Sequence, residues 1–434
     1  MTGTAASTAA DAADAAGTAG TAAGAPRGRA LVTVPAARLH PAIVHDATRK
    51  RLTERGLPAG PGLMRFDPLL ASRAVTVPEL LDAEADPADL DAYIAGLVVV
   101  GRLTAADEDP GTEAPGPDGG GGYEDEHLDR VVLDGVTGRV FTLYLYEEHP
   151  EDAELLPLAP SLAALARLLA AAEELGVRRG AAGPDAVADA SARFLRAVGE
   201  EEWAGEWGPA GEAAQWDDPV PAFWRVNALI RPLALIAAPG GGLLMDLPAA
   251  VLEAEFGAGA MVRADPARLP AALEHGPTRR FLTGPGLPAD SPLFRLAGPD
   301  DLLLPAPGDR EPSAGAGRTA VEAGRPLHLG FLIEDNEVVI DGRTGEVHLL
   351  LPGEDRLTPL NGDVSALAFT LWTHHRERTL DQDHGFAEEA YEQLADAMER
   401  TLASVDPVAC RPTGEHDDWR PWPELFHDEA GGVL

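Results

Sequence analysis

The 434-residue chain has one cysteine, Cys410, and one lysine, Lys50. Cys410 has no second thiol to pair with, so an intramolecular disulfide is excluded. A zinc site built from several thiolates is excluded for the same reason. These absences argue against a disulfide-stapled secreted protein, and a reducing cytoplasm suits the composition.

Positive charge is scarce. The chain has 34 Lys and Arg residues against 71 Asp and Glu residues, a net charge of −37. Nucleic acid and anionic membranes would repel such a surface, so we expect no direct binding to either. No run of 18 or more apolar residues is present, so no membrane span is expected. The charge suits a basic protein partner, and the alternative that it only keeps the protein soluble stays open.

The N-terminal segment lacks the residues that build a core. Its first 25 residues contain no Val, Ile, Leu or aromatic residue. They also lack the basic start and the apolar centre of a signal peptide. We therefore predict a disordered Ala/Thr/Gly-rich tail over residues 1–30.

The rest of the chain is dominated by an internal repeat. Residues 37–66 and 267–296 are identical at 15 of 30 positions without gaps, where about one in ten is expected by chance. Residues 129–144 match 336–351, and residues 155–169 match 357–371, in the same order. A repeat of this length indicates a duplicated domain. The predicted boundaries are 31–235 for the first copy and 236–434 for the second.

Each copy has the same expected order of elements. An opening helix is expected over 37–54 or 267–283, and Gly-Leu-Pro ends it. Short strands follow at 63–66 or 293–296, and then apolar strands at 94–103 or 327–333. A hairpin comes next, with strands expected over 130–133, 139–146, 337–340 and 346–351. Its turn, Asp-Gly-x-Thr-Gly, is a strong hairpin signal.

Helices are expected after each hairpin. An apolar stripe from Leu360 to Trp372 has helical spacing, with Asn361 or Asp363 as the N-cap. The first copy matches, with Ser161 as the N-cap. Further helices are expected over 186–198 and 386–402, and a Trp-Arg pair recurs at 224–225 and 419–420. The predicted fold class is α+β: two tandem domains, each a small, mainly antiparallel sheet packed by helices.

The copies differ by an acidic segment. The offset between them falls from 230 (267 − 37) to 207 (336 − 129), so the first copy holds 23 extra residues, in segment 104–128. This segment contains eight acids and no Lys or Arg. We predict a loop that attracts a basic partner, and a solvated insertion without function is the alternative. The candidate partner-binding residues are Asp107, Glu108, Asp109, Glu124, Asp125 and Glu126.

Motifs of catalysis are mostly missing. The glycine run 119–122 is not followed by GK[ST], and no G-x-S-x-G, H-E-x-x-H or C-x-x-C occurs. The densest polar stretch, 374–384, suggests a metal site of His375, Asp383 and His384, but a helix end reaching solvent explains it as well. His45 and His275 recur before Thr-Arg in both opening helices, which indicates a shared packing role or a binding role. We expect no cofactor and no metal.

These motifs, in this order and present twice, resemble the SUKH superfamily, and most closely its fourth subfamily of bacterial immunity proteins. The matching motifs are L-T-x-x-G-L-P, an apolar strand containing glycine, D-G-x-T-G-x-V and a P-L start to the next helix. The resemblance covers roughly residues 37–175 and 262–380 and implies an α+β fold. It also implies the following scaffold positions: Gly56, Leu57, Pro58, Asp134, Thr137 and Gly138 in the first copy, and Gly286, Leu287, Pro288, Asp341, Thr344 and Gly345 in the second.

The resemblance further implies a non-enzymatic, cytoplasmic immunity protein. Such a protein binds and neutralises a polymorphic or contact-dependent toxin, often a nuclease or deaminase, so the expected partner is a basic toxin domain. The first copy departs from the family pattern with Gly96-Leu97 and Ala159-Pro160, where the second has Gly330-Phe331 and Asn361. A general protein-interaction scaffold and, less favoured, a metal-dependent hydrolase are the alternatives. The oligomeric state stays open.

Overall fold

The computed structural model presents the chain as two sheets joined by helices. It describes the following residues: 31–58, 62–66, 75–81, 85–104, 127–146, 149–177, 180–201, 203, 207, 220–299, 301–304, 326–351, 357–411 and 420–430. The predicted tail 1–30 lies outside these residues.

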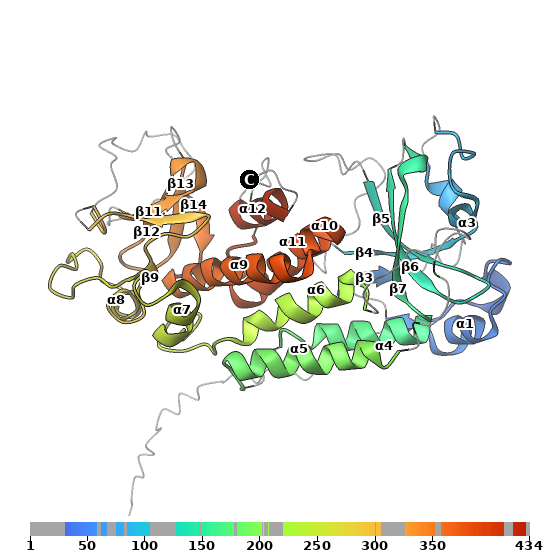
Figure 1. Cartoon of the computed structure of the whole chain (residues 1–434), viewed down its shortest axis with the longest axis horizontal. Coiled ribbons are helices and arrows are strands. Elements are labelled where there is room, and N and C mark those ends of the chain that lie inside the picture. The colour runs from blue at the N-terminus through green and yellow to red at the C-terminus, as the bar shows by residue number, and fades with distance from the viewer. Residues whose placement is uncertain are drawn as a thin grey trace, which may run out of the picture.

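Two five-stranded antiparallel sheets, one in each copy, lie at opposite ends of the molecule (Figure 1). The first contains β3 (Met64–Phe66), β4 (Val98–Leu103), β5 (His127–Leu133), β6 (Val140–Tyr146) and β7 (Glu154–Ala159), in that order. The second contains β10 (Phe294–Leu296), β11 (Leu327–Leu332), β12 (Asn336–Ile340), β13 (Val347–Leu350) and β14 (Leu357–Asn361). The predicted α+β class with tandem copies is confirmed.

The hairpins form where the turn motif predicts them. β5 pairs with β6 so that Leu133 lies opposite Val140, and β12 pairs with β13 so that Ile340 lies opposite Val347. The second glycine of each turn, Gly138 or Gly345, has φ of 81° or 83°. Such a backbone strongly favours glycine.

The last strand of each sheet was not predicted. β7 pairs with β6, and β14 pairs with β13. Each contains a proline, Pro157 or Pro359, and lies at the sheet edge, where a residue without an N–H is tolerated. Leu360 belongs to β14 and therefore starts no helix.

The prediction for the opening helices was wrong in length. α1 (Asp46–Lys50) continues as a π-helical turn to Arg55, and α8 (Gly276–Thr283) is its counterpart. Residues 39–45 and 269–275 are not helical. The amides of His45 and His275 donate instead to the hairpin turns at Gly135 and Gly342. A long-range contact therefore takes the hydrogen bonds that a helix would use.

The predicted strand 94–103 also begins later. Asp91 caps the short helix α3 (Ala92–Ala95) through bonds from the amides of Tyr93 and Ile94, and β4 starts at Val98. Its counterpart β11 runs over Leu327–Leu332, close to the prediction.

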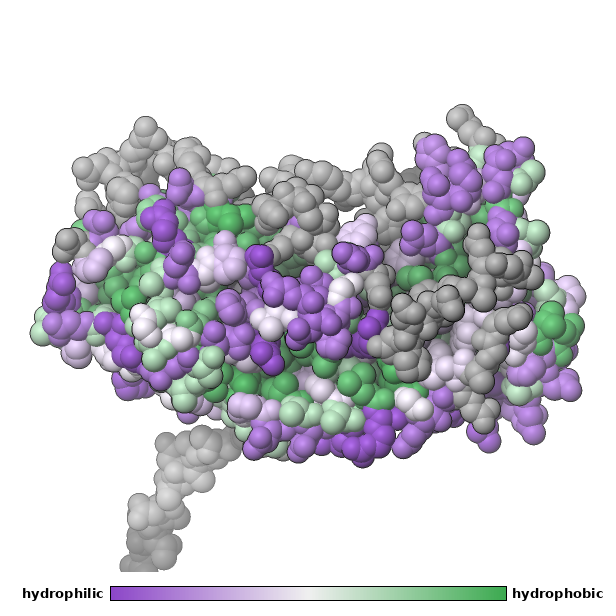
Figure 2. Space-filling view, viewed as in Figure 1, coloured by the Kyte–Doolittle hydropathy of each residue, from purple (hydrophilic) through white to green (hydrophobic). Residues whose placement is uncertain are grey.

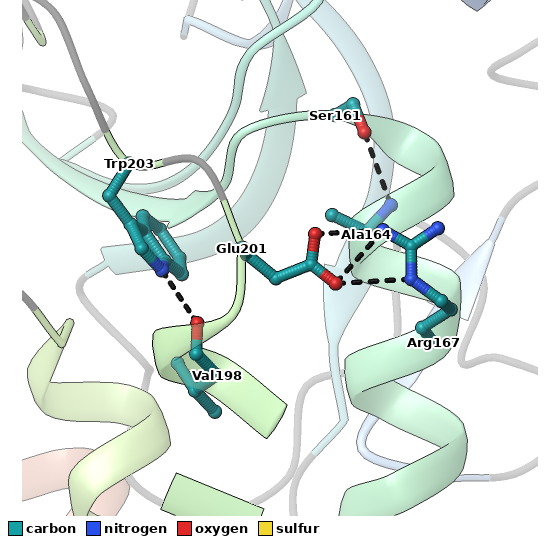
Figure 3. Close-up of polar contacts among 6 residues, drawn as sticks. All are labelled: Ser161, Ala164, Arg167, Val198, Glu201 and Trp203. Carbon is teal, nitrogen blue, oxygen red and sulfur yellow. Dashed lines mark hydrogen bonds and ion pairs between the residues drawn. The ribbon is translucent and has the colours of Figure 1, made fainter. Parts of the chain in front are cut away.

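The predicted helix after each hairpin is present. α4 (Leu162–Glu173) is capped by Ser161, whose Oγ accepts from the amide of Ala164 at 3.1 Å (Figure 3). α9 (Val364–His384) is capped by Asp363 rather than Asn361. The next helix is α5 (Pro184–Gly199) in the first copy, and in the second the predicted helix breaks at Ala390 into α10 (Phe386–Glu389) and α11 (Tyr391–Val405).

An ion pair fixes the end of α5 to α4. Arg167 of α4 donates from Nη2 to both carboxylate oxygens of Glu201, at 2.9 and 2.7 Å, and from Nε at 3.0 Å (Figure 3). Trp203 donates from Nε1 to the carbonyl of Val198 at 2.9 Å. The bidentate geometry orients the chain as it leaves α5.

Each copy ends on a buried tryptophan. Trp224 in α6 (Ala222–Ile230) donates to the carbonyl of Leu158 at 2.6 Å, at the end of the first sheet. Trp422 in α12 (Pro421–Ala430) donates to Asn361 at 3.1 Å, at the end of the second. Both tryptophans are fully buried. Trp422, and not the Trp419 of the repeated Trp-Arg pair, is therefore the counterpart of Trp224.

α6 belongs to both hydrophobic cores. Trp224 and Ala228 pack in the core of the first copy, and Val226 and Ile230 pack in the core of the second. The 3-10 helix η5 (Arg231–Leu235) continues it and contacts both α5 and α11. The predicted boundary between residues 235 and 236 falls at the end of this shared segment and stays a prediction.

The remaining elements close the ends of each copy. Two-stranded sheets pair β1 (Leu31–Val32) with β2 (Leu57–Pro58) and β8 (Met261–Val262) with β9 (Leu287–Pro288). The 3-10 helix η3 (Val77–Leu80) and α3 cover the outer face of the first sheet, and α7 (Ala249–Phe256) packs against α9.

Hydrophilic side chains are widespread on the face shown in Figure 2, over α9 and along the edge formed by α5, with apolar side chains between them. Among the described residues, no helix combines the length and the apolar character that a membrane crossing requires.

We expect Ile230→Ala to lower the free energy of unfolding by about 2–5 kcal/mol, because it leaves a cavity where α6 meets the second core. Urea unfolding followed by circular dichroism measures this. Because α6 is shared, the variant should still unfold in one transition. The control Val177→Ala, at a side chain that is 46% exposed, should change stability by less than about 0.5 kcal/mol. Two transitions, of which only one moves, would contradict the shared core.

Candidate functional site

The residues that recur in both copies meet at one place in each. The carbonyl of Gly135, in the first hairpin turn, accepts bonds from the amides of Val44 and His45, both at 2.9 Å. The carbonyl of Gly342 accepts from Glu274 and His275 at 2.7 and 2.8 Å. The hairpin turn is thereby clamped to the segment that leads into α1 or α8.

The repeated histidines complete this clamp. In the first copy, His45 Nδ1 lies 2.8 Å from Thr48 Oγ1, and in the second, His275 Nδ1 lies 2.8 Å from Thr278 Oγ1. A Cβ atom on Gly138 or Gly345 would overlap with these histidine rings. Both threonines are buried. The pattern supports the packing role that the repeat suggested for these histidines.

The repeated arginines bond to the same segment. Arg49 donates to the carbonyl of Ile43 at 2.7 Å, and Arg279 donates to the carbonyl of Leu273 at 2.9 Å. They thereby satisfy carbonyls in the segment before each helix.

The turn aspartate is bonded within its own turn. Asp134 Oδ1 accepts from the amides of Val136 and Thr137, and Oδ2 accepts from Thr137 Oγ1 at 2.7 Å and Tyr93 Oη at 3.2 Å. Burial alone would raise the pKa of Asp134, but these bonds outweigh it and lower the pKa. Burial, with the charge of Asp134, raises the pKa of Tyr93. Asp341 makes the same two amide bonds, to Arg343 and Thr344.

The Gly-Leu-Pro positions follow the helical segment that the clamp holds in each copy. Gly56 and Gly286 have φ of 68° and 77° and lie against the carbonyls of Val32 and Val262. Leu57-Pro58 and Leu287-Pro288 are the strands β2 and β9. Gly56 and Gly286 therefore lie where two backbone segments meet, whereas the exposed Thr137 and Thr344 bond within their own turns.

The two clamps present different surfaces. Next to the first lie Val44 and Val136, which are 56% and 69% exposed. The matching positions of the second copy are Glu274 and Arg343, both exposed. The scaffold has been kept while its surface has changed.

The predicted acidic partner-binding residues lie outside the described residues. These are Asp107, Glu108, Asp109, Glu124, Asp125 and Glu126. The described chain reaches Thr104 after β4 and resumes at His127, the first residue of β5.

The predicted metal ligands are not brought together. His375 Nδ1 pairs with Glu255 Oε1 at 3.1 Å, and His384 stacks on Phe386 with a centroid distance of 5.2 Å. Asp383 is exposed. These three residues therefore do not form the metal site that a metal-dependent hydrolase would require.

Other side chains in the described ranges are closer to a metal-binding arrangement. His149, Glu151 and Asp152 have ligand atoms within 4.8 Å of one another, but all three are exposed. Asp396, Glu399 and His427 form a second such group between α11 and α12. There Glu399 already pairs with Arg420 at 2.8 Å. Neither group was singled out from the sequence, and the residues of the second come from two separate helices.

The single cysteine is unsuited to nucleophilic chemistry. Cys410 is buried, and burial, together with the charges of Glu399 and Asp406, raises the pKa of its thiol well above the usual value. The thiolate is the nucleophilic form, so this thiol is inert.

Two partly buried arginines lie where the copies meet. Arg231 donates to the carbonyl of Ala172 at 2.7 Å, and burial, with a contribution from nearby Arg400, lowers its pKa to about 10. Arg400 of α11 donates to the carbonyl of Thr104 in the first copy. The Arg400 contact ties the second copy to the point where the acidic segment begins.

A cavity of about 10 Å³ lies beside this contact. Its lining includes Asn227 and Gln393, which are 2% and 7% exposed and whose oxygens Oδ1 and Oε1 have no hydrogen-bond partner among the described residues.

The comparisons with known proteins match both copies. The sequence model of the SUKH-4 immunity protein family matches residues 8–202 and 247–428. No curated protein and no solved structure matches the chain.

We expect Gly138→Ala and Gly345→Ala to destabilise the protein strongly, because each adds a positive-φ alanine and a clash with His45 or His275. Gly180→Ala is the matched control, since Gly180 has φ of 86° and nothing within 4 Å of an added Cβ. It should cost about 1–2 kcal/mol, the backbone strain alone. The clamp variants should lose about 1–3 kcal/mol more. Equal losses in thermal unfolding at all three positions would argue against the clamp.

We expect Asp134→Asn to flatten the dependence of stability on pH in acid. Because the pKa of Asp134 is lowered in the folded protein, its carboxylate stabilises the fold above the usual value of 3.8. This stability is lost as the pH falls through the folded pKa. At neutral pH the variant should be less stable by about 1–2 kcal/mol. In urea unfolding measured from neutral to acid pH, the difference in the free energy of unfolding between the wild type and the variant should become smaller. A constant difference would contradict this assignment.

Proposed function

The chain belongs to the SUKH-4 immunity protein family, and on that premise we propose that it binds and neutralises a protein toxin in the cytoplasm of the cell that makes it. The proposal rests on the match of the family in both halves of the chain. On this proposal the protein acts by stoichiometric binding and catalyses no reaction.

The proposed partner is a basic toxin domain, such as a nuclease or a nucleic-acid deaminase. An enzyme that acts on nucleic acid carries a basic surface for its substrate. A protein with a net charge of −37 attracts such a surface over long distances and raises the association rate. Bound there, it would cover the surface that the toxin uses for nucleic acid.

The acidic segment is the proposed point of first contact. Its residues Asp107, Glu108, Asp109, Glu124, Asp125 and Glu126 lie within 20 positions of one another in a chain segment free of Lys and Arg. This density of charge supports a role in steering, which depends on local potential more than on shape.

We expect the purified protein to abolish the activity of a toxin domain encoded beside its gene, at one-to-one stoichiometry. Toxin activity on nucleic acid, titrated with the protein, and size-exclusion chromatography of the mixture measure this. Raising the salt concentration should lower the association rate, because screening weakens the attraction. Activity that survives an excess of the protein, for every such toxin, would refute the proposal.

A charge variant tests the acidic segment. Changing the six candidate acids to their amides reduces the net negative charge from −37 to −31 (−37 + 6). We expect the association rate to fall about 10-fold while the dissociation rate changes little. The control variant has the same net charge, because six exposed acids elsewhere are changed to their amides. These are Asp46, Glu54, Asp185, Asp189, Glu200 and Asp290. Equal rates for the two variants would assign the effect to net charge and not to the segment.

A further inference from the structure

Two exposed valines lie next to each other on the clamp of the first copy. Val44 and Val136 are 92 positions apart in the chain (136 − 44). The amide of Val44 donates to the carbonyl of Gly135 at 2.9 Å, and this carbonyl belongs to the peptide unit that leads into Val136. The valine side chains are 56% and 69% exposed, and Val136 is the most exposed large hydrophobic side chain of the described residues. Pro41 and Ala47, three positions to either side of Val44, are also exposed and carry no charge.

The fold does not require valine at either position. The clamp uses only the backbone here, because Val44 bonds through its amide and the amide of Val136 donates to Asp134 Oδ1 at 2.8 Å. In the second copy, the amides of Glu274 and Arg343 make the equivalent bonds, both at 2.7 Å. The same clamp therefore forms with charged side chains on its surface.

The difference between the two clamps indicates a contact surface on the first. Single exposed apolar side chains are common in proteins, whereas neighbouring ones at one place mark sites of interaction. Equivalent positions carry two valines in one copy and two charges in the other. Folding does not account for this difference. A contact with another molecule does, because it removes both valines from water.

The net charge of the chain indicates which kind of molecule covers the valines. Two copies of a chain with a net charge of −37 repel each other, and such a charge keeps a protein monomeric. A partner with a basic surface is attracted by the same charge. A basic protein is therefore a better occupant of this surface than a second copy of the chain.

We propose that Val44 and Val136 form an apolar contact for a basic protein partner, which buries an apolar side chain of its own against them. The inference rests on the proposed function and locates one place where the toxin domain is bound. The acidic segment and the valines then have separate roles, since long-range charge raises the association rate and buried apolar contacts slow dissociation. The second clamp does not make this contact, because Glu274 and Arg343 would lose their hydration there.

Grafting the residues of the second copy onto the first tests this contact. The double variant Val44→Glu with Val136→Arg keeps the net charge at −37 (−37 − 1 + 1). We expect its dissociation rate from a toxin domain encoded beside the gene to rise at least about 10-fold, because the burial of two valines is lost. The association rate should stay within about 2-fold of the wild type. Surface plasmon resonance with the full-length protein measures both rates.

The control exchanges the charges of the second clamp, Glu274→Arg with Arg343→Glu, and should dissociate as the wild type does. A rise equal to that of the graft would overturn the assignment to the first copy. Thermal unfolding checks that each variant is folded. If the graft does not fold, Val44→Thr with Val136→Thr keeps the shape of the side chains and should raise the dissociation rate in the same direction. An unchanged rate in that variant would overturn the inference.

The outcomes separate this inference from the proposed function. If the graft dissociates as slowly as the wild type from a toxin that the wild type neutralises, the valine contact alone is refuted. If the wild type binds no such toxin, both proposals are refuted. Analytical ultracentrifugation of the protein alone, at physiological salt, should show a monomer. A dimer that the graft abolishes would assign the valines to a second copy of the chain and overturn the inference.

Discussion

The packing of α6 between the two cores holds the molecule together. One face of this helix buries Trp224 and Ala228 in the first copy, and the other buries Val226 and Ile230 in the second. A helix that is apolar on two faces cannot leave either core without exposing to water the face that packs there. The copies are therefore fixed relative to one another, and the contact of Arg400 with the carbonyl of Thr104 adds to this packing. The two copies therefore present one surface with a set geometry and not two tethered domains.

Local chemistry made part of the fold predictable. The Asp-Gly-x-Thr-Gly turns specify their hairpins within five residues, because the aspartate bonds its own turn and the second glycine takes positive φ. The opening helices were predicted too long because their first residues bond to a turn about 90 positions away in the first copy and 70 in the second. The edge strands β7 and β14 were missed because each runs directly into the apolar stripe of the following helix.

The candidate sites, like the fold, were predictable from the sequence only where their contacts are local. The repeat pointed to His45 and His275, since retention in both copies is visible in one sequence, and their contacts are local. It also paired Trp224 with Trp419, although only the fold shows that Trp422 takes this position. The polar stretch of α9 was recognised, but the choice of His375, Asp383 and His384 needed the direction of the helix faces, which packing decides.

Duplication separates the demands of folding from those of recognition. The clamp residues are the same in both copies because each fills a place where backbone segments cross and a change is costly. The surface beside the clamp is free to differ, and Val44 and Val136 are matched by Glu274 and Arg343. The longer α9 and the acidic segment also occur in one copy each. A fused pair can therefore present two unlike surfaces on a single scaffold. This doubles the surface that can change without loss of the fold.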